Sequence, residues 1–333
     1  MSRALLRLSR RRVLQGSTVL AVVCGLLLWW LLPFGESAPS GRLTFSTGVK
    51  SGVYQRYGEL LKGALARDLP EVEIDLRVSE GSQQNLARVA SGEADYTIAT
   101  ADAVATYQRH ARPGADRLRA CARLYDDYVQ LVVPQGSRVE AAGGLRGMRV
   151  GVGQPGSGVR LIAERVLTAA GLDADEDIKP VSAGIDTMPG LLEAGRLDAF
   201  FWSGGLPTSA VQSLSERLPI RLVPLDDKLV DQLLDAGSIT RYYRSAVIPA
   251  DAYPHILGGP VQVQTVAVTN LLVTTTDADP ELTERFTRTV INSRDRIGHE
   301  VHPAQLVDFR TAIYTDPLPL HEGARRYYRS TKP

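Results

Sequence analysis

The feature that most constrains the fold is a repeated unit in which a strand leads into a small polar loop and then a helix. The unit occurs three times in succession after residue 41. Its strands are predicted at 42–46, 72–78 and 92–102, and each is followed by a polar loop and a helical segment. This repetition is typical of a parallel sheet covered by helices, whose ligands bind beyond the carboxyl ends of the strands. We therefore expect the three loops to meet at one edge of a sheet.

The same pattern restarts in a glycine-rich stretch at residues 145–172, LRGMRVGVGQPGSGVRLIAERVLTAAGL. It predicts a strand at 148–152, a turn at 153–158 and a helix at 159–170. Glycines let the backbone approach a ligand closely, and amides at a helix start favour an anion. The stretch lacks the Lys-Ser/Thr pair of a P-loop, the acidic residue of a dinucleotide site and the spacing of a nucleophile elbow. A purely structural turn is the alternative.

Later segments complete a second sheet. Strands are predicted at 178–182, 198–202 and 222–224, and the long segments 125–133 and 261–275 are able to cross between two sheets. Helices at 281–300 and 303–313 then return to the first sheet. The prediction is an α/β protein with domain 1 at 42–133 and 268–333 and domain 2 at 134–267. Two crossing strands form the hinge, and the domains close over a ligand in the cleft.

The N-terminus differs in kind from the rest. Residues 1–35 combine arginines with an apolar run at 19–32 and read as a signal peptide or membrane anchor, followed by a tether at 36–41. The run SRRRVLQ at 9–15 resembles a twin-arginine signal. The apolar run gives only ~21 Å of helix, although residues 13–32 reach ~30 Å. We expect an exported chain that stays attached to the membrane if the segment is not cleaved.

Composition excludes some partners and cofactors. Among 333 residues, 38 Lys and Arg balance 37 Asp and Glu for a net charge of +1, so we expect no nucleic-acid partner. Hydrophobic residues at 44% suffice for real cores. Cys121 has no partner in the exported part. His299 and His302 have a spacing that suits a shared metal but lack a third ligand, so we predict no metal and no cofactor.

Several segments together resemble the TAXI group of solute-binding proteins that serve TRAP transporters. They lie in the same order over nearly the whole exported chain, as TFSTGVKSGVYQRYG, GSQQNLARVASGEADYTIATAD, the glycine-rich stretch, LLEAGRLDAFFWSGGLP and PLPLHEGARRYY. The resemblance implies a two-domain Venus-flytrap fold of the periplasmic-binding-protein type, without catalysis. It also implies delivery of a small anionic solute, such as glutamate, glutamine or 2-oxoglutarate, to TRAP membrane subunits.

Binding roles follow for residues in the converging loops. Amides around Ser157 and Gly158 are expected to hold a carboxylate, and Ser82 and Asn85 another polar group. The complete candidate set comprises Thr47, Gly48, Lys50, Tyr54, Ser82, Asn85, Thr100, Gln154, Ser157, Gly158, Arg160, Trp202 and Gly204.

Within this set, Lys50 and Arg160 are the candidate counter-charges, while Tyr54 and Trp202 supply apolar walls. Structural roles are the alternatives. Ser82 is also a natural helix cap, Trp202 is also suited to a core, and Asp102 is expected to cap a helix rather than to contact an anion.

Two other functions remain open at this stage. A membrane-tethered sensor that reports ligand occupancy is compatible with the Trp29-Trp30 pair and the weak cleavage site at the end of the apolar run. An enzyme on the same fold is less favoured, because the sequence shows no nucleophile with its base and no paired carboxylates at a credible spacing.

Overall fold

The computed structural model describes residues 40–256 and 262–331, which belong to one compact unit. Their strands form one ten-stranded sheet with the order β2-β1-β3-β10-β4-β7-β5-β6, while β8 pairs with β4 and β9 with β10. The strands are β1 (Gly41–Ser46), β2 (Val72–Arg77), β3 (Tyr96–Thr100), β4 (Leu118–Pro134), β5 (Arg149–Gly151), β6 (Lys179–Val181), β7 (Ala199–Gly204), β8 (Ile220–Val223), β9 (Tyr243–Pro249) and β10 (Gln262–Thr275).

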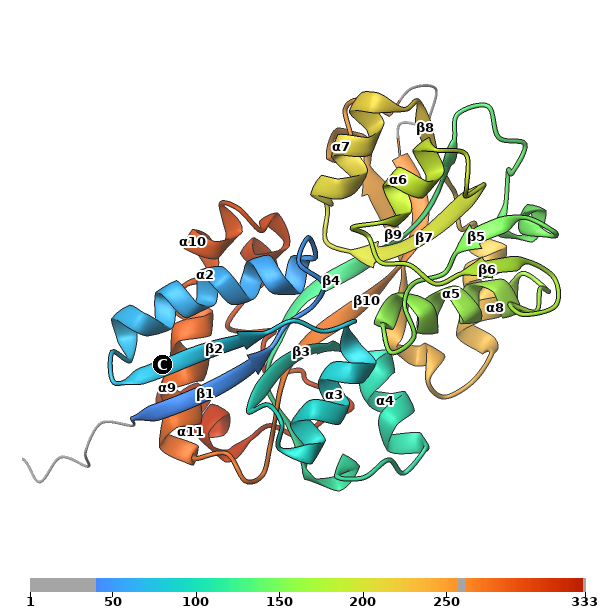
Figure 1. Ribbon diagram of the computed structural model, residues 1–333. Coiled ribbons are helices and arrows are strands. Elements are labelled where there is room, and N and C mark those ends of the chain that lie inside the picture. Colours follow the sequence, from blue (N-terminus) through green and yellow to red (C-terminus); the bar gives the residue numbers. More distant parts are fainter. Residues whose placement is uncertain (1–39, 257–261, 332–333) are drawn as a thin grey trace, which may run out of the picture. The chain divides into compact units, whose positions relative to one another are not determined.

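Two long antiparallel strands, β4 and β10, run through the whole sheet. Their register extends from Ala267 opposite Tyr128 to Thr275 opposite Leu118, with two irregularities between Thr269 and Val273. One end of this pair joins β3, and the other end joins β7, β8 and β9. Figure 1 shows both strands passing between the two halves of the fold. Within residues 40–256 and 262–331, β4 and β10 are the strands that connect the two halves of the sheet.

Buried apolar side chains divide at the middle of these two strands. On β4 the changeover lies between Tyr125 and Val129, and on β10 between Val268 and Leu271. We call residues 41–125 and 271–331 the first lobe, and the described residues of 129–268 the second lobe. The domain boundaries expected from sequence, at 133/134 and 267/268, stay a prediction. The cores favour placing the first crossing inside β4 rather than at its end.

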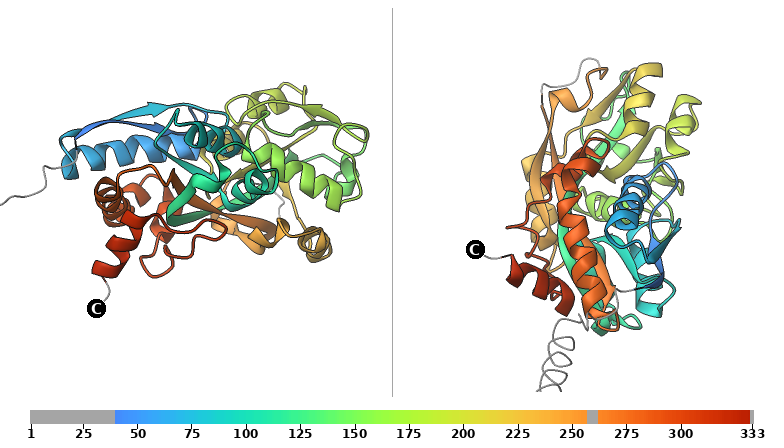
Figure 2. Two further views of the ribbon diagram at one scale, coloured as in Figure 1. Left: turned by 90° about the horizontal axis from the view of Figure 1, so that it is seen from below. Right: turned by 90° about the vertical axis from the view of Figure 1, so that its left-hand side faces the viewer.

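Helices cover both faces of each half of the sheet. The α-helices are α2 (Val53–Asp68), α3 (Ser82–Ser91), α4 (Ala101–Arg109), α5 (Gly158–Ala169), α6 (Met188–Glu193), α7 (Ser209–Arg217), α8 (Asp227–Asp235), α9 (Pro280–Asn292), α10 (Arg294–Gly298) and α11 (Glu322–Ser330). In the first lobe, one core cluster joins α2, α9 and α11 to the sheet, and another joins α3 and α4 to the opposite face. Helix α11 packs against α9, and both views of Figure 2 show these orange and red helices together.

Spacing of apolar residues explains why these segments form helices. In α2, Tyr57, Leu61 and Leu65 recur every fourth residue and are buried, so they form one stripe on the sheet. In α9, Phe286 stacks on Tyr96 of β3 at a ring-centroid distance of 4.2 Å. This contact fixes a helix from the end of the chain to a strand from its beginning, because a stacked aromatic pair is favourable beyond the area that it buries.

The structure corrects some predicted elements. A helix was expected at 303–313, but only a short 3-10 helix forms at His302–Leu306. Beyond it, the Asp308 carboxylate accepts a hydrogen bond of 2.7 Å from the Arg310 amide, and this local turn competes with helix formation. Sequence patterns also missed β9, α6, α8 and α11. The predicted signal or anchor and the tether up to residue 39 lie outside the described residues.

Candidate functional site

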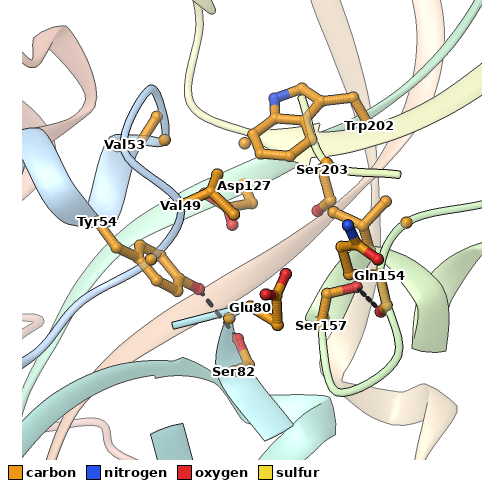
Figure 3. A pocket seen from close by; sticks show the side chains of 18 of the residues that line it. Val49, Val53, Tyr54, Glu80, Ser82, Asp127, Gln154, Ser157, Trp202 and Ser203 are labelled. Atoms are coloured by element: carbon orange, nitrogen blue, oxygen red, sulfur yellow. Dashed lines mark hydrogen bonds between the residues drawn. The ribbon is translucent and has the colours of Figure 1, made fainter. Parts of the chain in front are cut away.

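A cavity of about 60 Å³ lies between loops of the two lobes. The loops that bound it follow the carboxyl ends of β1, β2, β3, β5 and β7, as expected for a parallel sheet. At ~10–15 Å³ for each water, the cavity has room for several waters. It therefore suits a small solute rather than a polymer. Figure 3 shows its labelled side chains facing one space.

From the first lobe, the candidate residues that line the cavity are Gly48, Tyr54, Ser82 and Thr100. Ser82 lies at their centre. Its hydroxyl oxygen is 3.2 Å from the Tyr54 hydroxyl and accepts a 3.2 Å hydrogen bond from the Thr100 amide. The prediction that Ser82 caps helix α3 is wrong, because Gly81 is the capping residue and Ser82 is the first helical residue. Its side chain is therefore directed to the cavity wall and not to its own helix.

From the second lobe, the candidate residues that line the cavity are Gln154, Ser157, Gly158, Trp202 and Gly204. Ser157 caps α5, since its hydroxyl accepts a 3.0 Å hydrogen bond from the Arg160 amide and donates to the Gln154 carbonyl at 2.7 Å. The Trp202 ring borders the cavity, while its indole nitrogen donates to Thr208 at 3.0 Å. That hydrogen bond fixes the orientation of the ring.

Gly153 makes this glycine-rich turn possible. Its φ is +85°, a conformation that side chains rarely adopt. A Cβ atom there would also lie 2.9 Å from both the Arg160 amide nitrogen and the Ser157 hydroxyl oxygen. A larger residue would therefore displace the cap of α5 and with it the wall of the cavity.

Two predicted binding residues belong to the framework beneath the cavity. Asn85 is fully buried, accepts from the Ser46 hydroxyl at 2.7 Å, and donates to the carbonyls of Thr47 and Ile98 at 2.7 and 2.9 Å. Thr47 donates to Gln55 at 2.5 Å. Because these side chains are occupied by framework hydrogen bonds, they hold the first loop against α3 and do not line the cavity.

The two predicted counter-charges also lie outside the cavity lining. Lys50 is exposed at the tip of the first loop. The Arg160 guanidinium pairs with Glu164 at 2.5 Å and with Asp175 at 3.5 Å. Arg160 and Glu164 are four residues apart on α5, a spacing that favours such a pair. These pairs keep Arg160 on the outer side of the helix.

Asp127 is a buried charged residue of the cavity that the sequence patterns did not single out. It lies on β4, is 4% exposed, and has one carboxylate oxygen, Oδ1, without a hydrogen-bond partner. Burial raises the pKa of Asp127 to about 7 against the lowering effect of the Asn270 side chain, and the carboxylates of Asp126 and Asp102 act in the same direction as burial. The signal available in the sequence was a pair of consecutive acids inside an otherwise apolar strand.

Asp126 points to the other face of β4, where it is paired. Arg244 donates to it at 2.6 Å and Thr269 at 2.7 Å. Burial opposes ionisation, but these hydrogen bonds and the charge of Arg123 hold the pKa of Asp126 below its ordinary range. The two neighbouring carboxylates therefore differ in their surroundings. Asp126 pairs with arginine on one face of β4, whereas Asp127 faces the cavity.

Four helices begin at the cavity, which makes its loops favourable for a negatively charged group. The capping residues of α2, α3, α4 and α5 all line it, namely Gly52, Gly81, Thr100 and Ser157. Amides at a helix start have no partner within the helix and carry the positive end of its dipole. The arrangement can hold a carboxylate without an arginine.

The two lobes contact each other around the cavity. The Gln84 amide donates to the Gly156 carbonyl at 3.0 Å, and the Gln83 side chain donates to the Ser157 carbonyl at 2.8 Å. Both bonds join the second loop of the first lobe to the glycine-rich turn. These loops of the two lobes are therefore in direct contact at the cavity.

A buried ion pair also joins the lobes. Arg165 on α5 donates to Asp102 on α4 at 2.7 Å, and the Tyr243 hydroxyl donates to the same carboxylate oxygen at 2.6 Å. Arg165 also donates to Thr106 at 2.6 Å. We call these four residues the Arg165 bridge. The prediction that Asp102 caps a helix is wrong, because its carboxylate makes no cap hydrogen bond and serves this bridge instead.

The described residues contain neither a group of metal-binding side chains nor a membrane-spanning helix. Within 40–256 and 262–331, no three His, Cys, Asp or Glu side chains are grouped so that they could hold a metal ion. Across those two ranges, no helix combines the length and apolar character needed to cross a bilayer.

A family model described as NMT1-like matches residues 45–331. The chain belongs to the NMT1-like family. The match includes both lobes and every loop of the cavity, so the site described above lies within the family's common region. The narrower placement in the TAXI group stays a prediction.

Solved structures show how the NMT1-like chain folds. It is similar to an ancestral arginine-binding protein bound to arginine, with 16% identity, 78% of this chain and 98% of that chain covered, and a TM-score of 0.50. A protein from Bordetella bronchiseptica RB50 is 17% identical, with 88% of this chain and 90% of that chain covered and a TM-score of 0.50. The periplasmic aliphatic sulphonate binding protein from Escherichia coli is 16% identical, with 89% of this chain and 80% of that chain covered and a TM-score of 0.43. The expected two-domain α/β fold of the periplasmic-binding-protein type is confirmed.

Proposed function

We propose that this NMT1-like protein binds a small solute outside the cytoplasm and delivers it to a membrane transporter without changing it chemically. The observation that carries the proposal is a cavity whose walls come from both lobes, which β4 and β10 connect within the described part of the sheet. Such a geometry lets a solute enter an open form and be buried by closure. Binding in this manner stores no covalent intermediate and needs no cofactor.

The likeness to solved binding proteins and the export features of the N-terminus support the location and the transport role. Within that role, we propose the TAXI group as the narrower family and TRAP-type membrane subunits as the partner. The proposal includes export by the twin-arginine route and attachment to the membrane if residues 1–35 remain. Its candidate solutes are glutamate, glutamine and dicarboxylates such as 2-oxoglutarate.

Carboxylate recognition in this proposal relies on helix starts. The amides that follow Gly81 and Ser157 open α3 and α5, and the hydroxyls of Ser82 and Ser157 lie on the same wall. Backbone amides and hydroxyls give shorter, stronger hydrogen bonds to a carboxylate than to a neutral acceptor. The apolar side chains of Val49, Met188 and Trp202 would contact the carbon skeleton of the solute.

A thermal-shift titration tests this function. At a concentration about one hundred times Kd, a ligand that binds only the folded protein adds ~2.7 kcal/mol to the free energy of unfolding. For a chain of this size we expect a rise in Tm of roughly 5 °C. The test uses residues 36–333 with the twenty protein amino acids, glutarate and 2-oxoglutarate.

A blocked variant and a matched glycine control sharpen the titration. In Gly158→Val, the added Cβ would lie 3.1 Å from the Ser82 hydroxyl oxygen and the further methyls would fill the cavity, so the ligand-induced shift should disappear. Gly63 on α2 has no atom within 4 Å of an added Cβ, and Gly63→Val should retain the shift. A Tm that no solute in the panel changes, or a shift that survives in Gly158→Val, contradicts binding in this cavity.

A further inference from the structure

The charges that line the cavity have the opposite sign from those expected for an acidic solute. Among the described lining residues, the charged side chains are Glu80 and Asp127, and no lysine, arginine or histidine is present. Glu80 lies exposed at the edge, whereas Asp127 is buried. A dicarboxylate would bring two negative charges to a wall that already contains a carboxylate, and like charges at short range in a dry site repel strongly.

The side chain of Asn270 on β10 partly offsets the effect of burial on the pKa of Asp127, but no cation faces this carboxylate among the described residues that line the cavity. The Oδ1 atom of Asp127 has no hydrogen-bond partner, and neither does the hydroxyl of Ser203, which lines the same cavity. Its neighbour Asp126 shows what this chain does with a structural carboxylate, because there two arginines and a threonine surround it. A buried carboxylate without such partners is costly unless a ligand supplies a donor.

Aromatic rings beside Asp127 suit a cation as well. Trp202 and Tyr54 line the same cavity as Asp127, and Figure 3 shows the three labelled side chains around it. An ammonium group is attracted to the face of an aromatic ring, most strongly to tryptophan. Since Trp202 is held by its hydrogen bond to Thr208, its face is already in place before a ligand arrives.

The cavity has groups that favour a negative charge and groups that favour a positive charge. Helix starts at Gly81 and Ser157 favour a carboxylate, while Asp127 on the crossing strand favours a donor with positive charge. We propose that the solute is a small zwitterion, in which an ammonium group pairs with Asp127 and a carboxylate lies at the starts of α3 and α5. This inference rests on the proposed function and narrows its candidates to amine-bearing acids.

Matched pairs of solutes test the inference by isothermal titration calorimetry. Each amino acid that binds is compared with the acid that lacks only the amine, for example L-glutamate with glutarate and L-glutamine with glutaramate. We expect the amine-bearing member to bind wild-type protein at least 100-fold more tightly. In Asp127→Asn the preference should fall to 10-fold or less, because the amide keeps the shape of the side chain but removes its charge.

Two further variants show whether the effect of Asp127→Asn on affinity is specific to this position or follows from the loss of any negative charge. Glu80→Gln alters the exposed carboxylate at the edge, where solvent screens it, and should weaken binding by less than 10-fold. Asp231→Asn removes an exposed carboxylate from α8 and should leave affinity unchanged. Circular dichroism and thermal unfolding show whether each variant is folded.

The outcomes distinguish this inference from the function on which it rests. If glutarate or another amine-free acid binds as tightly as its amino-acid partner, the zwitterion is wrong while solute binding stands. Retention of a 100-fold preference in Asp127→Asn likewise overturns the role of Asp127. If neither the twenty amino acids nor their amine-free partners bind, the proposed function and this inference both fail.

Discussion

Replacing Asp127 with asparagine should stabilise the ligand-free protein at pH 8 by about 2–4 kcal/mol. Burial raises the pKa of Asp127 from an ordinary 3.8 to about 7. Keeping this buried side chain ionised at pH 8 therefore costs about 4 kcal/mol, at ~1.36 kcal/mol for each tenfold change in proton affinity. Asparagine removes the charge but still needs hydrogen-bond partners, so part of the gain is lost.

The pH dependence gives the sign of the effect. An acid with a raised pKa binds its proton more tightly in the folded state than in the unfolded state. Below about pH 4 the acid is protonated in both states and does not lower the free energy of unfolding. The penalty then grows as the pH rises towards 7 and is constant above it. Neighbouring ionisable groups, namely Tyr54 on α2, Asp102 on α4, and Tyr125 and Asp126 on β4, are the same in both proteins. Their contributions therefore largely cancel in the comparison.

Urea unfolding at pH 5, 6, 7 and 8 measures this difference, after bound solutes have been removed by unfolding and refolding. The advantage of Asp127→Asn should be smallest at pH 5 and should reach its plateau near pH 8. Asp231→Asn serves as the control for loss of one surface charge. An advantage that does not change between pH 5 and pH 8 would show that Asp127 ionises without cost.

Removing the Arg165 side chain has the second large effect. Arg165→Met should lower the free energy of unfolding by about 3–5 kcal/mol, because it leaves the buried Asp102 carboxylate without its cation. The Asp102 side chain is 2% exposed and that of Arg165 is 18% exposed, so water cannot readily replace the lost contact. The bridge joins α4 of the first lobe to α5 and β9 of the second. Its loss should therefore also speed release of a bound solute.

A double-mutant cycle and a control on the same helix isolate the ion pair. Asp102→Asn combined with Arg165→Met should recover at least 1 kcal/mol of the loss, since no unpaired charge then remains buried. Arg160→Met, five residues earlier on α5, breaks pairs with Glu164 and Asp175 and should cost less than about 1 kcal/mol. Chemical denaturation measures the unfolding free energy of Arg165→Met, Asp102→Asn, their combination and Arg160→Met. Equal losses in Arg160→Met and Arg165→Met would refute a special role for the bridge.

Local patterns predicted the scaffold of the site because strands, turns and helix starts are encoded over short stretches. The turn at 153–158 illustrates this, since its glycines and the Ser157 cap are neighbours in sequence and are neighbours in the fold. The convergence of Ser82 and Ser157 followed from one general property of parallel sheets. These inferences needed no knowledge of which distant strands pair.

Side-chain direction could not be predicted where it depends on distant pairing. Asn85 is three residues from the cavity residue Ser82 in the sequence. Its side chain lies beneath the cavity because it forms hydrogen bonds with Ser46, Thr47 and Ile98. Asp126 and Asp127 alternate across β4, and only the register with β10 decides which of them faces the cavity. The pairing of Arg160 could have been predicted, because its partner Glu164 stands one helical turn away in the sequence.

A crystal structure of residues 36–333 with the tightest-binding solute of the panel would show whether the cavity between the lobes is the binding site. We expect electron density for the solute in this cavity, with its carboxylate near the starts of α3 and α5 and its amine within hydrogen-bond distance of Asp127. Density for the solute elsewhere on the protein, with no atom near Ser82, Ser157 or Trp202, would contradict this expectation.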